Sequence, residues 1–284
     1  MEIINRRQRI FSISRKLRRE EKTVGFVATM GALHEGHLTL VKEARRMCDV
    51  VIVSIFVNPT QFNDPADLEK YPRDLTADAA LLAEYEVDYV FAPEKQEVYP
   101  EGFSTYVTVE NLTETLEGAS RPGHFRGVST VVTILLNTIR PDHAFFGQKD
   151  AQQVAVIKRL VIDLGFETEI AVVPTVREES GLAMSSRNTL LSADEHEKAV
   201  VIIDSLREAK LAFKKGERNA SALTQIVRDR IAVEPLARLD YVAVVDRDSL
   251  QPVEKVGDNE TLIAIAAFIG DVRLIDNVIL NRKQ

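Results

Sequence analysis

Cysteine is nearly absent from this 284-residue chain, which has only Cys48, and histidine is scarce, with five residues. Structural zinc sites are built from four Cys or His ligands, so this content argues against one. Hydrophobic runs are short as well: none approaches the roughly 20 apolar residues that cross a bilayer, and Met1 to Arg7 lack the apolar segment of a secretory signal. We therefore expect no membrane partner and a cytoplasmic location, where one unpaired cysteine is ordinary.

An excess of basic residues is also missing. The chain has 36 Lys and Arg against 43 Asp and Glu, a formal net charge of −7. Nucleic-acid binding draws its affinity mainly from Lys and Arg that neutralise phosphates, so we expect no nucleic-acid partner and favour a small-molecule ligand. The basic clusters at Arg15–Arg19 and Lys214–Arg218 are interpreted as solvated helix faces.

Length and hydrophobic pattern predict the fold class. With 284 residues, 45% of them hydrophobic, the chain can form one large or two modest domains with a packed core. Short apolar runs alternate with helical patterns. The expected strands are 24–29, 50–56, 88–92, 143–147 and 168–174, and the expected helices are 37–48, 74–85, 128–139 and 150–164. This alternation predicts an α/β fold, a Rossmann-like parallel sheet with helices on both faces.

The pattern changes after residue 176. Ser192 to Glu195 form a capping box that predicts a long helix through about Lys214, and a second helix is expected over 219–232. Strand-like runs follow at 239–245, 261–267 and 272–279, which predict a small antiparallel sheet. We therefore divide the chain into residues 1–176, a nucleotide- and substrate-binding domain, and residues 177–284, a smaller α+β domain.

The segment Thr29–Leu38 places two imidazoles three residues apart, where an apolar run gives way to a helical pattern. His34 and His37 are thus expected at the first turn of a helix, whose unpaired N–H groups and dipole attract anions. Gly31 and Gly36 leave the backbone open to a nucleotide. The zinc-protease pattern His-Glu-x-x-His is not met, because the second histidine comes one residue early. The segment favours phosphate handling.

The His-x-Gly-His pattern after a first strand resembles the signature of the nucleotidylyl transferase superfamily, which includes class I aminoacyl-tRNA synthetases. Five further motifs narrow this resemblance: Phe56–Phe62, Tyr71–Asp74, Arg121–Gly127, Phe145–Gln153 and Met184–Asn188. In this order they closely resemble the pantoate–β-alanine ligase family over essentially the whole chain. In parallel sheets ligands bind beyond the carboxyl ends of the strands, so His34, Gln61 and Lys149, which each follow an expected strand, are expected on one rim.

The resemblance implies a two-step reaction in which pantoate and ATP give a pantoyl adenylate and β-alanine then displaces AMP. It also implies Mg²⁺ with ATP, a homodimer, and closure of the smaller domain over the nucleotide. Two alternatives stay open. Another nucleotidylyl transferase, moving AMP or CMP onto a phosphate-bearing substrate, would share the histidines and Arg187 without needing the two glutamines, Gln61 and Gln153. An RNA-binding or synthetase-like module would require a basic face, against which the acidic balance counts.

The phosphate-binding and catalytic group combines neutral and charged hydrogen-bond donors, which stabilise charge growing on phosphoryl oxygens. It consists of His34, His37, Lys149, Ser185, Ser186 and Arg187, the last three resembling the second, mobile phosphate-binding signature of the superfamily. ATP binding is assigned in addition to Met30, Gly147, Asp150, Val176 and Met184. Asp150 has an alternative role as N-cap of the helix that begins near Ala151.

Pantoate carries hydroxyls, a carboxylate and a gem-dimethyl group, so its pocket should combine amide groups with apolar walls. We assign Gln61, Gln153 and Met30 to it. The glycine-rich segment 111–127 is expected to be a lid that excludes water. Arg121 is expected to contact phosphate or close the lid, and a surface position is the alternative. Asp78 is the candidate Mg²⁺ ligand, although the family pattern is incomplete there and an acidic residue on a helix is usually solvated.

Overall fold

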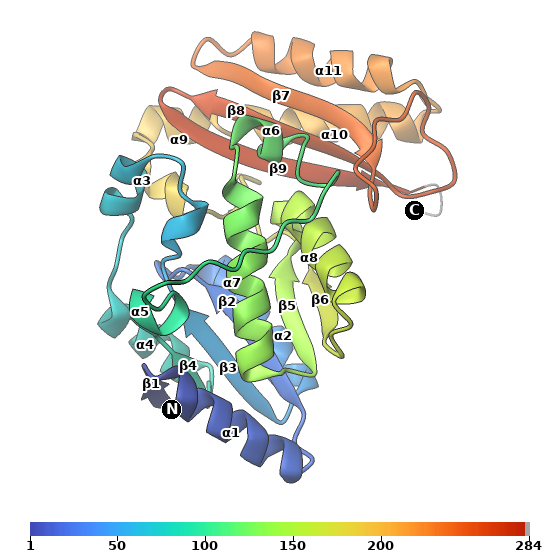
Figure 1. Cartoon of the computed structure of the whole chain (residues 1–284). Coiled ribbons are helices and arrows are strands. Elements are labelled where there is room, and N and C mark those ends of the chain that lie inside the picture. The colour runs from blue at the N-terminus through green and yellow to red at the C-terminus, as the bar shows by residue number, and fades with distance from the viewer. Residues whose placement is uncertain (282–284) are drawn as a thin grey trace. The chain divides into compact units, whose positions relative to one another are not determined.

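The computed structural model describes residues 1–281, which form two compact units (Figure 1). The first comprises residues 1–148 and 156–174, and the second comprises residues 149–155 and, of the described chain, residues 175–281. The boundary after residue 176 and the closure of the smaller domain over a nucleotide stay predictions. No helix within residues 1–281 is long and apolar enough to span a membrane.

The first unit is built on a six-stranded sheet in which every neighbouring pair is parallel. In spatial order its strands are β1 (Glu2–Ile4), β4 (Tyr89–Phe91), β3 (Val50–Ile55), β2 (Val24–Thr29), β5 (His143–Gly147) and β6 (Glu169–Val173). The predicted parallel α/β sheet is confirmed. Because β3, β2 and β5 are adjacent, the segments that follow them leave the sheet at neighbouring carboxyl ends, where α/β proteins bind their ligands.

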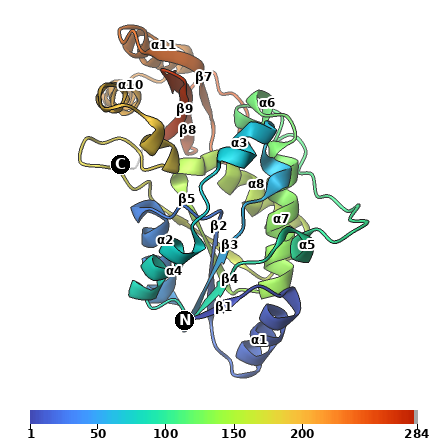
Figure 2. The same ribbon diagram turned by 90° about the vertical axis from the view of Figure 1, so that its left-hand side faces the viewer.

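Helices cover both faces of this sheet. The helices of this part of the chain are α1 (Arg7–Arg19), α2 (Glu35–Met47), α3 (Pro65–Lys70), α4 (Leu75–Glu84), α5 (Lys95–Val98), α6 (Glu117–Ser120), α7 (His124–Ile139) and α8 (Ala151–Asp163). Figure 2 shows α2 and α4 on one side and α1 and α7 on the other. On the α2 side, Val27, Val53 and Val90 of three neighbouring strands pack against Val41 of α2. These buried contacts fix where α2 begins relative to the sheet.

Cys48 lies in the same core, 6% exposed, at the end of α2. A Cβ added at Gly25 of β2 would lie 3.0 Å from its sulfur, so helix and strand approach each other closely there. Burial, with a smaller contribution from Asp142, raises the pKa of the Cys48 thiol from 9.0 to about 11. The thiol is therefore neutral at physiological pH.

This pKa shift predicts an alkaline loss of stability. The unfolded thiol ionises near pH 9.0 and the native thiol only near 11, so the stabilisation is complete below pH 9 and is lost as pH rises toward 11. Between pH 8 and pH 11 the parent protein should lose unfolding free energy, and so should Cys48→Ala. The loss should be about 2 kcal/mol larger in the parent, because only the parent has the buried thiol. Urea titrations of both proteins at the two pH values measure this, and an identical pH dependence would contradict it.

The second unit contains a three-stranded antiparallel sheet in the order β7 (Ala237–Asp246), β8 (Thr261–Ile269) and β9 (Val272–Leu280). Its helices are α9 (Ala193–Lys198), α10 (Val201–Lys214) and α11 (Ala220–Ala232). Leu206 and Leu223 of α10 and α11 pack with Ile263 and Ile265 of β8. The predicted smaller α+β part is confirmed.

The single long helix expected from Ser192 to Lys214 is wrong, because it is divided into α9 and α10. The capping box at its start is present: the Ser192 hydroxyl accepts from Glu195 N–H, and the Glu195 carboxylate accepts from Ser192 N–H. The Ile202 N–H then bonds to Ala199 O, three residues back. This tighter turn ends the α-helical pattern.

Candidate active site

The connection from β2 to α2 carries the two predicted histidines. Together their side chains cap the N-terminus of α2. The His34 ring accepts a hydrogen bond at Nδ1 from Gly36 N–H (3.1 Å), and the His37 ring accepts at Nδ1 from His34 N–H (3.3 Å). The two ring centroids are 4.1 Å apart. This is a reciprocal capping box built from imidazoles in place of the usual hydroxyl and carboxylate.

The capping box assigns the tautomers of both rings. A ring nitrogen that accepts a hydrogen bond carries no hydrogen, so each neutral imidazole has its hydrogen on Nε2. His34 and His37 can therefore each offer an Nε2–H donor at the start of α2, where the helix dipole favours an anion. This is the chemistry that the sequence predicted for the segment.

Asp78 of α4 braces the backbone just before these histidines. Its Oδ2 accepts from Ala32 N–H (3.1 Å) and its Oδ1 from Leu33 N–H (2.9 Å), and Asp78 is 4% exposed. Gly31 and Ala32 both have left-handed backbone conformations, with φ of +82° and +51°. For Ala32 this conformation is costly, so it needs such fixed partners.

The role of Asp78 as an Mg²⁺ ligand stays a prediction. Within residues 1–281 no three His, Cys, Asp or Glu side chains gather in a way that would hold a metal. Mg²⁺ bound with ATP typically takes only one or two protein carboxylates, and each carboxylate oxygen has two lone pairs. Asp78 therefore fits as a single ligand while it also braces the loop.

Gln61 lies at the end of a 3-10 turn, Pro59–Gln61, that follows β3, and its amide is held from two sides. Asn58 Nδ2 donates to Gln61 Oε1 (3.0 Å), and Gln61 Nε2 donates to Met30 Sδ (3.1 Å). Asn58 is 1% exposed, and its own Oδ1 accepts from the hydroxyls of Thr60 and Tyr99. The structure thus joins two of the three predicted pantoate residues, Gln61 and Met30.

Sequence reasoning missed Asn58 and Tyr99, which orient the Gln61 amide. Asn58 also donates to Gly127 O (3.1 Å), which ties the turn to α7. A signal was present in the Asn58-Pro59 pair, because an asparagine before proline at the start of a turn commonly accepts from the following N–H groups. Tyr99 gave no such local signal, since its partners lie some forty residues earlier in the chain.

Arg121, predicted as a lid residue, lies beside this turn. Its guanidinium donates to Gln61 O (3.4 Å) and is 3.3 Å from His124 Nε2, while His124 Nδ1 bonds the same carbonyl at 2.9 Å. Gly123, at φ +84°, sets the turn that leads into α7. Arg121 is therefore placed next to the predicted pantoate residues, and its lid function stays a prediction.

The segment from Gly147 to Gln153 carries four predicted site residues in sequence. Gly147 ends β5, a 3-10 turn covers Gln148–Asp150, and α8 begins at Ala151. Lys149 is partly exposed and Asp150 is exposed directly before α8, where the N-cap alternative placed it. Gln153 lies in the first turn of α8. The Lys149 carbonyl accepts from Asn277 Nδ2 at 2.9 Å.

The second predicted phosphate-binding signature follows a hairpin in the second unit. Met184 N–H bonds Val176 O (3.0 Å), and Arg177 pairs with Ala183, so the two arms lie antiparallel. The Ser185 hydroxyl oxygen then accepts from Arg187 N–H (3.3 Å) at the start of a 3-10 helix, Ser186–Leu190. The Ser185 O–H hydrogen can therefore donate elsewhere, and the Arg187 side chain is exposed.

The sequence model of the pantoate-beta-alanine ligase family matches residues 2–279. This chain belongs to the pantoate–β-alanine ligase family. The pantothenate synthetase of Pelotomaculum thermopropionicum is 51% identical over 282 residues, 99% of this chain and 100% of that protein. That of Heliobacterium modesticaldum is 52% identical over 280 residues, 99% of each chain.

Solved structures of the family agree with the fold. Pantothenate synthetase from Thermus thermophilus superposes with a TM-score of 0.90 at 42% identity, over 98% of this chain and 99% of that one. The pantoate-beta-alanine ligase from Francisella tularensis, complexed with beta-gamma ATP and beta-alanine, gives 0.81 at 40% identity over 98% and 97%. These similarities make the chain an acid–amine ligase and favour that interpretation over transfer of AMP or CMP to a phosphate-bearing substrate.

Proposed function

We propose that this chain condenses pantoate with β-alanine at the expense of ATP. A pantoate carboxylate oxygen attacks the α-phosphorus of ATP and pyrophosphate leaves; the β-alanine amine then attacks the acyl carbon, loses a proton, and AMP leaves. The products are pantothenate, AMP and pyrophosphate. The observation that carries the proposal is the pair of capping imidazoles at the start of α2 in a chain that matches this family over residues 2–279.

The imidazoles supply what the first step requires. Negative charge grows on the phosphoryl oxygens as pyrophosphate departs, and each preplaced donor is worth on the order of 3 kcal/mol. His34 and His37 offer Nε2–H donors whose rings are already fixed by the capping box. Asp78 keeps the preceding backbone in place. No covalent nucleophile is needed, because AMP is itself a good leaving group.

The predicted nucleotide-binding residues of the second unit and of the segment after β5 are proposed on their chemistry alone. Lys149 and Arg187 would neutralise phosphate charge, Arg187 as a two-pronged donor. Ser185 and Ser186 would donate from their hydroxyls. The remaining ATP-binding assignments are Met30, Gly147, Asp150, Val176 and Met184.

Three accompanying features belong to the same proposal. Mg²⁺ would accompany ATP and neutralise charge on its phosphate oxygens, with Asp78 as the protein carboxylate that fits it. The family resemblance supports a homodimer, which light scattering of the purified protein would test. Use of ATP as substrate supports a cytoplasmic location.

The deciding experiment is ATP–pyrophosphate exchange with a panel of acids. We expect exchange with pantoate in the absence of β-alanine, and pantothenate together with AMP once β-alanine is added. Exchange with a phosphomonoester and none with pantoate would overturn the substrate assignment.

Gln61→Ala is expected to raise the KM for pantoate about tenfold while changing the KM for ATP less than twofold, because the variant removes one fixed amide from the acid pocket. Steady-state kinetics with each substrate varied measure the two values. Gln96→Ala, on α5, is the matched control and should behave as the parent. Equal increases of both KM values in Gln61→Ala would remove Gln61 from the pantoate site.

A further inference from the structure

Strand β9 carries two adjacent buried polar residues that the reaction does not use, Asp276 and Asn277. Asp276 is 4% exposed and Asn277 is 5% exposed. Two other residues of the same strand belong to the apolar core or pack against it, Leu274 and Val278. Successive strand residues point to opposite faces of a sheet, so the two side chains serve different surroundings. Buried polar groups persist only with hydrogen-bond partners, and these partners identify what the pair does.

Asp276 holds the hairpin that precedes Ser185 through the side chain of Arg177. Its carboxylate accepts from both terminal nitrogens of Arg177, at 2.7 and 3.0 Å, a bidentate pair in which the Asp276 side chain is only 2% exposed. Arg177 Nη1 also donates to Gly181 O (3.1 Å) at the tip of the hairpin. The Arg177 guanidinium thus links β9 to the hairpin, because it contacts Asp276 and also Gly181 at the hairpin's tip.

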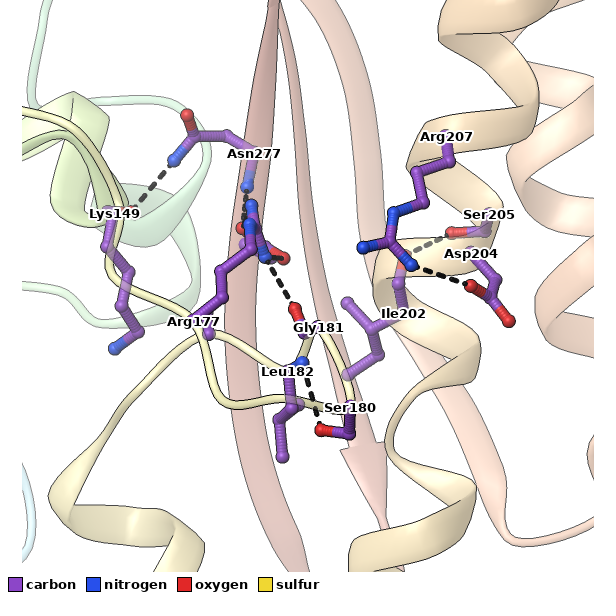
Figure 3. Close-up of polar contacts among 12 residues, drawn as sticks. Lys149, Arg177, Ser180, Gly181, Leu182, Ile202, Asp204, Ser205, Arg207 and Asn277 are labelled. Atoms are coloured by element: carbon purple, nitrogen blue, oxygen red, sulfur yellow. Dashed lines mark hydrogen bonds and ion pairs between the residues drawn. The ribbon is translucent and has the colours of Figure 1, made fainter.

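The same hairpin is tied to the 3-10 helix that carries Arg187. Asn188 Nδ2 donates to Ala183 O (3.1 Å) and to Glu178 Oε1 (2.7 Å). Gly181, at φ +96°, makes the turn, and a Cβ there would lie 2.7 Å from the Arg207 guanidinium, which is drawn beside it in Figure 3. The hairpin therefore has little freedom while Asp276 holds Arg177, and Ser185 follows it directly.

Asn277 holds the other segment. Its Nδ2 donates to Lys149 O at 2.9 Å, a bond that bridges 128 positions in sequence (Figure 3). The bond is to the backbone, so it fixes where Lys149 lies without occupying the ammonium group. Asn277 N–H also donates to Asp276 Oδ1 (2.7 Å), which links the two anchors.

We propose that Asp276 and Asn277 are positioning residues for the nucleotide, Asn277 acting through Lys149 and Asp276 through Arg177 and the hairpin leading to Ser185. Neither side chain touches substrate. The inference rests on the proposed function, because it takes Lys149 as a ligand of ATP. In this proposal β9, an edge strand of the small antiparallel sheet, sets the position of two phosphate-binding segments that are distant in sequence. One contains Lys149 and the other contains Ser185.

A double-mutant cycle tests the Asn277 arm, with the ATP dissociation constant measured by calorimetry on the full chain. We expect Asn277→Leu to weaken ATP binding about tenfold in the parent and less than twofold when Lys149 is already alanine. Asn281→Leu is the matched control, since it removes an asparagine that donates to Glu260 just beyond β9 (2.9 Å). It should leave ATP binding unchanged.

Three results overturn the proposal: an unchanged dissociation constant in Asn277→Leu, an equal loss in both backgrounds, or a Lys149→Ala variant that binds ATP as the parent does. Failure of the proposed function is seen separately, as a parent protein that forms no pantothenate. If Asn277→Leu caused only a general structural defect, its effect on ATP binding would be the same whether or not Lys149 is alanine. Positioning through Lys149 predicts a smaller effect in the Lys149→Ala background.

The Asp276 arm has its own matched pair. Asp276→Asn removes the carboxylate that faces the Arg177 guanidinium. Asp240→Asn is the control, because it removes another carboxylate of the same sheet that faces a guanidinium. There Arg273 Nε and Nη2 donate to Asp240 Oδ2 at 3.0 and 2.7 Å. We expect ATP binding to weaken about fivefold in the first and less than twofold in the second. Equal effects in the two variants would overturn the Asp276 assignment. Should Asp276→Asn not fold, the Asn277 cycle decides the proposal.

Discussion

His37→Gln is expected to slow adenylate formation by about 10²- to 10³-fold, the cost of losing a preplaced donor to a developing phosphoryl charge. Glutamine at the third helical position can still accept from His34 N–H, as in an ordinary capping box, so α2 should keep its start. Its amide N–H donors are carried on a chain with one more rotatable bond than the imidazole, so none is preplaced where the imidazole Nε2–H lies. Single-turnover release of pyrophosphate with ATP and pantoate measures the effect.

Stability measurements separate the two roles of this histidine. His37→Ala should lose the same activity and in addition about 1 kcal/mol of unfolding free energy, because it removes the cap acceptor as well. His34→Asn is the companion variant, since asparagine is a favoured N-cap residue that lacks the imidazole donor. Pyrophosphate release near the parental rate in His37→Ala would show that the ring serves only as a cap.

Gly127→Ala is expected to disrupt the pantoate pocket by displacing the turn that carries Gln61. A Cβ at Gly127 would lie 2.4 Å from Thr60 O and 2.7 Å from Gln61 N, both backbone atoms that cannot rotate away. The turn that carries Gln61 must therefore move away from α7. We expect a loss of about 1–3 kcal/mol of unfolding free energy, typical of overpacking, and a KM for pantoate raised more than that for ATP.

Urea unfolding and steady-state kinetics measure the two effects of Gly127→Ala. Gly257→Ala is the control, because a Cβ at that position meets no atom within 4 Å. A Gly127→Ala protein that is destabilised while its pantoate kinetics stay parental would show that the position of the 59–61 turn does not govern pantoate binding.

The elements that the sequence predicted well are those whose signal is local. Strands β2, β3 and β5 are buried on both faces and read as continuous apolar runs, which is typical of parallel sheets. Strand β1 was missed because its three residues, Glu2–Ile4, are too few to show a period and gain their place only by pairing with β4. Helix α1 was missed as an element, although its basic residues were interpreted as a solvated face; Ile10, Ile13 and Leu17 form its buried stripe.

The same distinction applies to the site. His34 and His37 were predicted at a helix start from spacing alone, because capping is a contact between near neighbours. The brace from Asp78, the orientation of Gln61 by Asn58 and Tyr99, and the anchoring of Lys149 by Asn277 were not predicted. Apart from the Asn58 contact, each joins residues more than thirty positions apart, and only the packing of the sheets brings them together.

The strand order of the larger sheet has a consequence for how the chain assembles. Gly25 of β2 pairs on one side with Val51 and on the other with His143. The histidine capping box is local and can form early, but the strand that supports it keeps an open, apolar edge until residue 143 has been made. Such edges pair readily with other chains, and distant pairings slow folding. A chain that stops before β5 should therefore aggregate rather than fold, and a nascent chain keeps this edge exposed until about half of its residues have been added.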